Sequence, residues 1–242
     1  MKLHTKGFLT ILGLTVLCFG LPTFGQAVVS VDFTGGYTTT FGNDGAGIYT
    51  ATINGASSPG IICDDFNDEV TAGETWNANA YQASSLTTSN IGETLFGNSI
   101  GVTGYAEVAT LASMMFSGSS SYGALTGITQ SELSSAIWDL TTPGGISGLD
   151  AKANQLVAAL TSAFNGNTST ATAYLDTLTN LWILTPDPKT GVGSGEPQEM
   201  WTKGLTVPEG GSALLYLMFA GITCFGAMFF RNRSECRNRG TV

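Results

Sequence analysis

The stretch VSVDFTGGYTTTFGNDGAGIYTATI, residues 29–53, contains two segments in which apolar and polar side chains alternate. The first runs from Val29 to Phe33 and the second from Tyr49 to Ile53. Alternation with a period of two places the apolar side chains on one face of a β-strand. The glycine, asparagine and aspartate residues between the segments are typical of turns. The stretch therefore predicts a β-hairpin with one buried face.

Further strands are expected on both sides of a helical segment. Short runs at 60–66 and 75–83 precede that segment, and runs at 180–188 and 197–205 follow it. Apolar residues recur at helical spacing in four stretches between them, at 104–116, 130–140, 149–164 and 171–178. Thr129 and Glu132 have the spacing of a capping box at the start of the second stretch. The order of elements predicts an α+β domain over residues 28–205, with a β-rich, sandwich or barrel-like body and a helical insert.

The two ends of the chain carry signals for export and anchoring. Residues 1–27 combine two lysines, an apolar run and small residues near the end, a pattern that predicts a signal peptide. Residues 213–230 form an uncharged apolar run, at the lower edge of the roughly 17–25 residues that a membrane helix needs. The four arginines in the tail 231–242 favour a cytoplasmic location for that end. The domain is therefore expected outside the inner membrane, anchored by a C-terminal helix.

Residues 206–212 link the domain to this apolar run and contain Val207, Pro208 and Glu209. The succession of motif, helix and arginine cluster resembles the PEP-CTERM sorting signal of Gram-negative bacteria. Gly210 stands where that family has a second proline. The resemblance implies two partners, the inner membrane and an exosortase-type enzyme that processes the chain near the motif. Processing would leave the protein on the outer surface or in the extracellular matrix.

The composition of residues 28–207 excludes several classes of function. Three lysines stand against sixteen acidic residues, and this charge argues against nucleic acid as a partner. The single histidine, His4, lies in the signal peptide, so the exported part has none for a catalytic triad or a zinc site. Cys63 is the only cysteine between the two ends, which excludes an internal disulfide. We expect a protein that is not an enzyme and needs no cofactor.

Cys63 opens the first of three motifs that follow one another along the chain: CDDF at 63–66, YAE at 105–107 and SAIWD at 135–139. Their order resembles a set of PEP-CTERM proteins of unassigned activity and, more distantly, the thioester (TQXA-like) domains of bacterial adhesins. The segment PQEM, residues 197–200, is also similar to the former set.

In thioester domains the cysteine is bonded to a glutamine side chain, and the thioester acylates surface amines. The position of that glutamine falls on Ser134 here, and Gln130 lies one helical turn before it. The resemblance implies either a thioester between Cys63 and Gln130 or a domain that has lost the cross-link. In the second case Cys63 would be a buried thiol that packs as a small hydrophobe.

Acidic residues directly after Cys63 support a further hypothesis. The strand 60–66 is expected to leave the core at Asp64. Asp65, Asn67 and Glu69 then alternate as the first ligands of a calcium loop do, and carboxylate and amide oxygens suit that cation. A solvated strand end or turn is the alternative interpretation. Calcium is the one cofactor that this pattern suggests.

Carbohydrate is the other ligand class to consider. Trp76, Trp138 and Trp182 are candidates for a carbohydrate surface, although Trp138 lies next to the apolar face of its helix, where core packing is expected. Paired carboxylates would also suit glycoside hydrolysis, but no pair in the sequence has a distinctive spacing.

These patterns together predict an exported, envelope-anchored surface or matrix protein of a Gram-negative bacterium. The resemblance to PEP-CTERM proteins implies a role in adhesion or in the organisation of exopolysaccharide. Three alternatives remain open: a reactive adhesin that uses a thioester of Cys63, a carboxylate glycosidase, and a calcium- or carbohydrate-binding module.

Overall fold

The computed structural model describes residues 27–142, 145–187 and 197–206. All of them belong to one compact unit that spans residues 26–207. The predicted signal peptide up to residue 26, the sorting motif 207–209, the membrane helix 213–230 and the tail 231–242 lie outside the described residues. Within the described ranges, no helix combines the length and apolarity needed to cross a bilayer.

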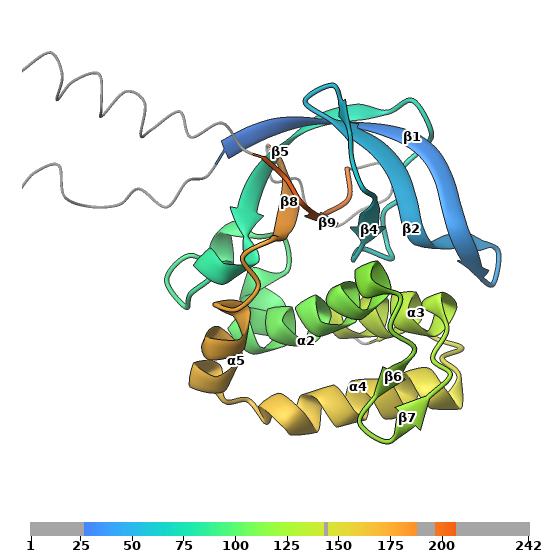
Figure 1. Ribbon diagram of the computed structural model, residues 1–242, viewed down its shortest axis with the longest axis vertical. Helices are drawn as coiled ribbons and strands as arrows, with labels where there is room; N and C mark the ends of the chain where they lie inside the picture. The colour runs from blue at the N-terminus through green and yellow to red at the C-terminus, as the bar shows by residue number, and fades with distance from the viewer. Residues whose placement is uncertain (1–26, 143–144, 188–196, 207–242) are drawn as a thin grey trace, which may run out of the picture. The chain divides into compact units, whose positions relative to one another are not determined.

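Seven antiparallel strands form the main sheet, in the order β1-β5-β8-β9-β4-β2-β3. They are β1 (Ala27–Phe41), β2 (Asp44–Ile53), β3 (Ala56–Ser57), β4 (Ile61–Cys63), β5 (Thr75–Gln82), β8 (Leu181–Asp187) and β9 (Met200–Lys203). β1 pairs with β2 as well as with β5, so six strands close on themselves and β3 extends from β2. The β-rich body is therefore a small barrel, which is visible at the top of Figure 1.

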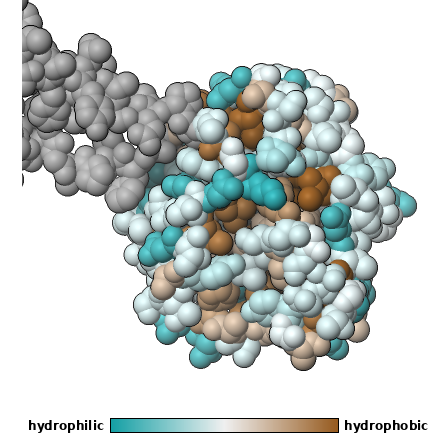
Figure 2. All heavy atoms as spheres, viewed as in Figure 1, coloured by the Kyte–Doolittle hydropathy of each residue, from teal (hydrophilic) through white to brown (hydrophobic). Residues whose placement is uncertain are grey.

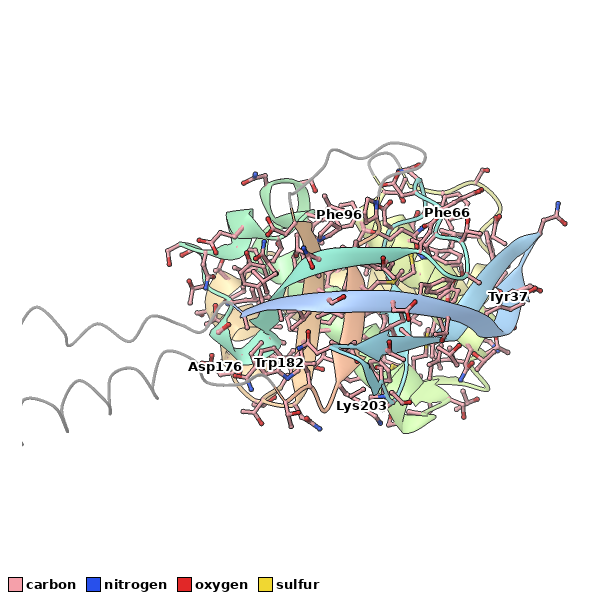
Figure 3. All side chains as sticks on the ribbon, turned by 90° about the horizontal axis from the view of Figure 1, so that it is seen from above. Tyr37, Phe66, Phe96, Asp176, Trp182 and Lys203 are labelled. Atoms are coloured by element: carbon pink, nitrogen blue, oxygen red, sulfur yellow. The ribbon has the colours of Figure 1, made fainter. Side chains whose placement is uncertain are left out.

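The length of β1 explains how the barrel closes. Its first half pairs with β5, where Val31 faces Trp76, and its second half pairs with β2, where Tyr37 faces Tyr49. The register of the second pairing shifts at several points between Phe33 and Thr39. Such bulges bend a strand and increase its twist. The predicted hairpin is thus confirmed, and its far end carries the exposed Tyr37 (Figure 3).

The helical insert lies between β5 and β8 in the chain and on one side of the barrel (Figure 1). It contains α2 (Gly97–Ser117), α3 (Gln130–Thr141), α4 (Ala151–Phe164) and α5 (Thr168–Leu175), with two 3₁₀ turns, η1 (Ala83–Ser85) and η2 (Ile91–Glu93), before them. A small hairpin of β6 (Ser121–Tyr122) and β7 (Leu125–Thr126) connects α2 to α3. The capping box of Thr129 and Glu132 is present at the start of α3. The predicted α+β class is therefore confirmed.

Helix α2 is longer than the predicted helix 104–116 because it continues across a break. Gly101 has a φ of 62° and a ψ of −170°, which are not helical angles. Glycine reaches this region of φ at little cost because it has no Cβ. The sequence pattern identified only the part of α2 that follows this break.

Two hydrophobic cores lie on the two faces of the barrel wall. The core inside the barrel contains inward-facing residues of the strands, among them Val31, Ile61, Cys63 and Met200. A larger core contains Ile62, Trp201 and much of the helical insert. Neighbouring residues along β4 and β9 thus alternate between the two cores, as the strand period of two requires. On the face shown in Figure 2, apolar residues form small separate patches among polar ones.

Candidate functional site

Cys63 is the last residue of β4 and faces the interior of the barrel. It lies opposite Met200, the first residue of β9. Only 3% of the cysteine surface is exposed. Gln198 lies two residues before Met200 along the chain and is 6% exposed. Side chains two positions apart in an extended chain point the same way, so this alternation directs Gln198 toward the same side as Cys63.

The sulfur of Cys63 lies against the side chain of Gln198. Its Sγ is 3.0 Å from Oε1 of Gln198 and 2.9 Å from the backbone oxygen of Asp65, so the thiol hydrogen has two acceptors within reach. The backbone N–H of Asp65 donates to the sulfur over 3.3 Å. The thiol and the carboxamide are therefore in direct contact.

The backbone oxygen of Asp65 also fixes the other end of the carboxamide. Nε2 of Gln198 donates to it over 3.1 Å. One carbonyl thus accepts hydrogen bonds from both the cysteine sulfur and the glutamine nitrogen. These are the two atoms between which a proton must pass when a thiol displaces ammonia from an amide.

Burial keeps the thiol of Cys63 protonated. Its pKa is raised well above the ordinary value, first by burial and then by the negative charges of Asp64 and Asp65. A cysteine in such a setting has little thiolate character and reacts slowly with oxidants and metals. The expectation of a buried thiol is correct, but the contacts of this thiol are polar.

Asp64 and Glu199 lie next to the two site residues in sequence and on the other side of the β4–β9 ladder. The backbone N–H of Asp64 donates to the oxygen of Glu199 over 3.4 Å. Neither side chain is exposed. Oδ2 of Asp64 accepts a 2.6 Å hydrogen bond from the indole N–H of Trp201. The prediction that the chain leaves the core at Asp64 is wrong, because this network gives the carboxyl buried partners.

The carboxylate of Glu199 has three donors from different elements. The backbone N–H of Leu95 donates to Oε2 over 2.8 Å, the hydroxyl of Thr185 donates to the same atom, and the hydroxyl of Tyr105 donates to Oε1. Thr185 belongs to β8 and Tyr105 to α2, so Glu199 ties the barrel to the helical insert. The buried network gives Glu199 a structural role that its sequence position did not reveal.

Burial raises the pKa of both carboxyl groups, but their other contacts differ. Burial raises the pKa of Asp64 well above its ordinary value, and the charge of Glu199 raises it further. The pKa of Glu199 is also raised by burial, but hydrogen bonds from Thr185, Tyr105 and Leu95 oppose that rise. Glu199 is therefore the better place for the negative charge, and Asp64 the better place for the proton.

Helix α3 holds the end of β4 from the side. The indole N–H of Trp138 donates to the backbone oxygen of Cys63 over 3.1 Å, and the hydroxyl of Thr141 donates to the backbone oxygen of Asp64. The ring of Phe66 packs against Trp138 with a centroid distance of 5.3 Å. The SAIWD motif thus lies against CDDF, and its tryptophan is a core residue of the helical layer.

The predicted glutamine partner of Cys63 has other contacts. Oε1 of Gln130 accepts a hydrogen bond from the hydroxyl of Thr38. Ser134, at the position where the resemblance implies the glutamine, accepts from the backbone N–H of Gly47 over 2.8 Å. The residue in contact with Cys63 is Gln198. The signal for it was its place in the segment PQEM, directly before a strand that could pair with β4.

The predicted calcium residues do not share one environment. Asp65 is 1% exposed, whereas Asn67 and Glu69 are exposed. Oδ1 of Asp65 accepts from the backbone N–H of Asn67 over 3.0 Å, as in a tight turn. Burial, with the neighbouring Asp68, raises the pKa of Asp65 to about 7. Among the described residues, no group of three or more acidic, cysteine or histidine side chains is placed to hold a metal ion.

The three candidate tryptophans do not share a surface. Trp138 is buried in the helical layer near Phe66, and Trp76 and Trp182 are half-buried against the barrel interior. Figure 3 shows Trp182 on the side of the molecule away from Phe66. A surface pocket of about 240 Å³ is lined by residues such as Phe116, Asn180 and Lys203, with no acidic side chain among its lining residues. It offers no carboxylate pair for glycoside hydrolysis.

No family model, no curated protein and no solved structure matches this chain. The site is therefore assessed from its own geometry: a thiol in contact with a carboxamide inside the barrel, and a buried carboxyl pair behind them.

Proposed function

We propose that the chain is an exported, membrane-anchored surface protein whose domain forms an internal thioester between Cys63 and Gln198 and attaches covalently to amines. The contact that supports this proposal is the 3.0 Å distance between Sγ of Cys63 and Oε1 of Gln198 in a buried site. Oε1 is bonded to the carbonyl carbon that the sulfur would attack, so this contact holds the sulfur next to the reacting carbon. This contact carries the proposal.

The thioester forms by an exchange at the side-chain carbonyl carbon of Gln198. The sulfur of Cys63 bonds to that carbon, the bond from the carbon to Nε2 breaks, and the thiol proton passes to the nitrogen, which leaves as ammonia. An external amine then attacks the same carbon. The carbon–sulfur bond breaks, the sulfur recovers a proton from the amine, and Gln198 becomes an N-substituted glutamine. Each molecule reacts once, so the protein is a reagent and not an enzyme.

Burial suits the thioester once it has formed. Exclusion of water protects a reactive ester from hydrolysis. The thiol proton has a short path to the leaving nitrogen, because the Asp65 carbonyl is hydrogen-bonded to both atoms. The carbonyl therefore fixes the distance over which the proton moves.

The ends of the chain supply the rest of the proposal. The signal peptide at 1–27, the motif at Val207, Pro208 and Glu209, and the apolar run 213–230 support export across the inner membrane and anchoring there. An exosortase-type enzyme is the proposed processing partner. A protein placed in this way would meet amines on neighbouring surfaces, or amines associated with exopolysaccharide, and adhesion would follow from the covalent bond.

The proposal is tested on the full-length chain, purified in mild detergent from a Gram-negative host. We expect the peptide pair that contains Cys63 and Gln198 to be lighter by one ammonia and resistant to thiol alkylation. Methylamine should add to Gln198 and make Cys63 available for alkylation in equal amount. A chain of full mass, whose thiol is alkylated after denaturation without methylamine, would overturn the thioester. It would leave the non-reactive matrix role as the interpretation.

A further inference from the structure

The residues that follow Cys63 and Gln198 in the sequence, Asp64 and Glu199, belong to a buried network of hydrogen bonds. Asp64 and Glu199 are fully buried, and their backbones are joined by the hydrogen bond from Asp64 N to Glu199 O. Trp201 donates to Asp64, and Tyr105, Thr185 and Leu95 N donate to Glu199. Five elements or connecting segments thus meet at this pair.

One side-chain oxygen of the pair differs from the others in its hydrogen bonding. Oδ1 of Asp64 receives no hydrogen bond among the described residues, whereas Oδ2 accepts from Trp201. A buried oxygen without a donor is costly when it carries charge, and it is satisfied when it carries a proton and donates. The negative charge of Glu199 raises the pKa of Asp64 more than any other charge does, so this carboxylate is the acceptor available to a proton on Oδ1.

We propose that Asp64 and Glu199 act as a positioning pair for Cys63 and Gln198: a proton held between the two carboxyl groups keeps the ends of β4 and β9 together, and its loss lets Gln198 move away from the thiol. The effect of this proton on thioester formation rests on the proposed function. The effect of the proton on the position of the two strand ends does not, and it is measured separately. The two carboxyls touch neither sulfur nor carboxamide, so they act through the backbone.

Among the residues that the structure describes, no cation lies near the pair to replace the proton. The ionisable groups that face it are Tyr105 from α2, Tyr81 from β5, and Cys63 and Asp65 from the end of β4. All four become negative or stay neutral as the pH rises. The two lysines of the described ranges are bonded elsewhere, Lys152 to Glu132 and Gly127, and Lys203 to the backbone of Phe116. Loss of the proton would therefore leave two like charges close together in a buried site, which repel.

The first measurement follows the reactivity of Cys63 in the full-length Gln198→Ala variant, in which no thioester can form. The rate of alkylation is measured from mildly acidic to alkaline pH in Gln198→Ala and in Gln198→Ala/Asp64→Asn, and the two profiles are compared with each other, because formation of the Cys63 thiolate raises both rates with pH. We expect the rate to rise more steeply with pH in Gln198→Ala. The rise should be smaller in Gln198→Ala/Asp64→Asn, because the asparagine amide donates to Glu199 at every pH. The difference at alkaline pH should be at least about tenfold, the factor that one pKa unit of coupling gives.

The second measurement follows the thioester itself in single variants. Asp64→Asn should retain the wild-type fraction of chains that have lost ammonia. Glu199→Gln should lose it, because the amide nitrogen replaces one of the two accepting oxygens and turns a donor either toward Leu95 N and Thr185 or toward Tyr105. Glu107→Gln, at another buried glutamate on α2, is the matched control and should retain it. Circular dichroism checks that each variant is folded.

The results separate the two proposals. Equal pH profiles for Gln198→Ala and Gln198→Ala/Asp64→Asn would overturn the positioning pair, even if the wild type contains a thioester. A folded Glu199→Gln variant with the wild-type thioester fraction would also overturn it. A wild type without ammonia loss would overturn the proposed function, while the alkylation comparison would still decide the role of the carboxyl pair.

Discussion

The two faces of the β4–β9 ladder carry polar groups in different states. On the barrel side, Cys63 and Gln198 are in contact with each other and share one backbone acceptor, the carbonyl of Asp65. On the helical side, the carboxylate of Glu199 has three donors, and Asp64 is bonded to Trp201. The first face has groups that can exchange a bond, and the second face has a carboxylate, Glu199, that is held by three donors.

This difference shows how one strand pair can serve two purposes. Because side chains alternate along a strand, adjacent residues belong to separate environments only a few ångströms apart. A saturated buried network is rigid, and a partly bonded thiol beside an amide is available for chemistry. The helical face therefore fixes the ladder that the barrel face needs. Variants on the two faces should have effects of different kinds.

The largest effect is expected from Gln198→Ala. This change removes the carbonyl carbon that the sulfur would attack, so methylamine incorporation should fall to zero while the domain remains folded. Gln130→Ala should leave incorporation unchanged, because Gln130 is bonded to Thr38. Mass spectrometry of the methylamine-treated chains measures both. If Gln130→Ala abolished incorporation and Gln198→Ala did not, the assignment of the site would be wrong.

Glu199→Ala should produce the largest loss of stability on the helical face. It leaves the hydroxyls of Tyr105 and Thr185 and the N–H of Leu95 buried without their acceptor. Breaking a buried charged network in this way costs roughly 3–5 kcal/mol in the free energy of unfolding. The matched control is Glu69→Ala at an exposed glutamate, with an expected change within about 0.5 kcal/mol. Urea unfolding measures both, and equal small losses would contradict a structural network at Glu199.

Trp201→Phe should have a smaller effect on the same network. Phenylalanine keeps most of the packing but lacks the N–H that donates to Oδ2 of Asp64 over 2.6 Å. The expected loss is about 1–3 kcal/mol in the free energy of unfolding, the cost of a buried polar atom without a partner. Trp182→Phe, at a half-buried tryptophan, is the control and should lose less. A greater loss at Trp182 would show that packing and not the hydrogen bond determines the result.

The regular elements could be predicted because their patterns are local. The alternation from Val29 to Phe33 and from Tyr49 to Ile53 identified the hairpin, and Thr129 with Glu132 identified the start of α3. Closure of the barrel could not be predicted, since it depends on the bulges that turn β1 from β5 to β2. The last helix was predicted at 171–178 and is α5 at 168–175, because Asn167 caps it through Thr170 N.

Only one of the two site residues could be predicted, because the two lie far apart in the sequence. Cys63 could be singled out as the only cysteine in residues 28–207, but its neighbour comes from position 198. The pairing of Cys63 with Met200 brings Cys63 and Gln198 together. The register between two strands that are far apart in the sequence cannot be predicted from either strand alone. Asp64 was expected at the surface because an aspartate is seldom buried without partners. Its partners Trp201 and Glu199 lie equally far along the chain.

A modest pH dependence of stability should come from Asp65. Its pKa is raised to about 7 by burial and by Asp68, whereas an aspartate in an unfolded chain has a pKa of about 3.9. Between these values the folded protein holds a proton that the unfolded chain releases. Stability is therefore fully present at acidic pH and falls as the pH rises toward about 7. Asp65→Asn should flatten this part of the profile, measured by urea unfolding at a series of pH values, and the exposed Asp176→Asn should not. An unchanged slope in Asp65→Asn would contradict the raised pKa.

The smallest effect is expected from calcium. A ligand that binds only the folded state raises the melting temperature in proportion to its affinity and concentration. Asp65 is buried and its Oδ1 is bonded to Asn67 N, whereas the side chains of Asn67 and Glu69 lie in solvent. A buried, bonded oxygen and two solvent-exposed side chains would have to come together to surround one ion, so calorimetry with and without calcium should give the same melting temperature. A rise that disappears in Asp65→Asn but persists in Asp176→Asn would contradict this and would make the turn after β4 a calcium site.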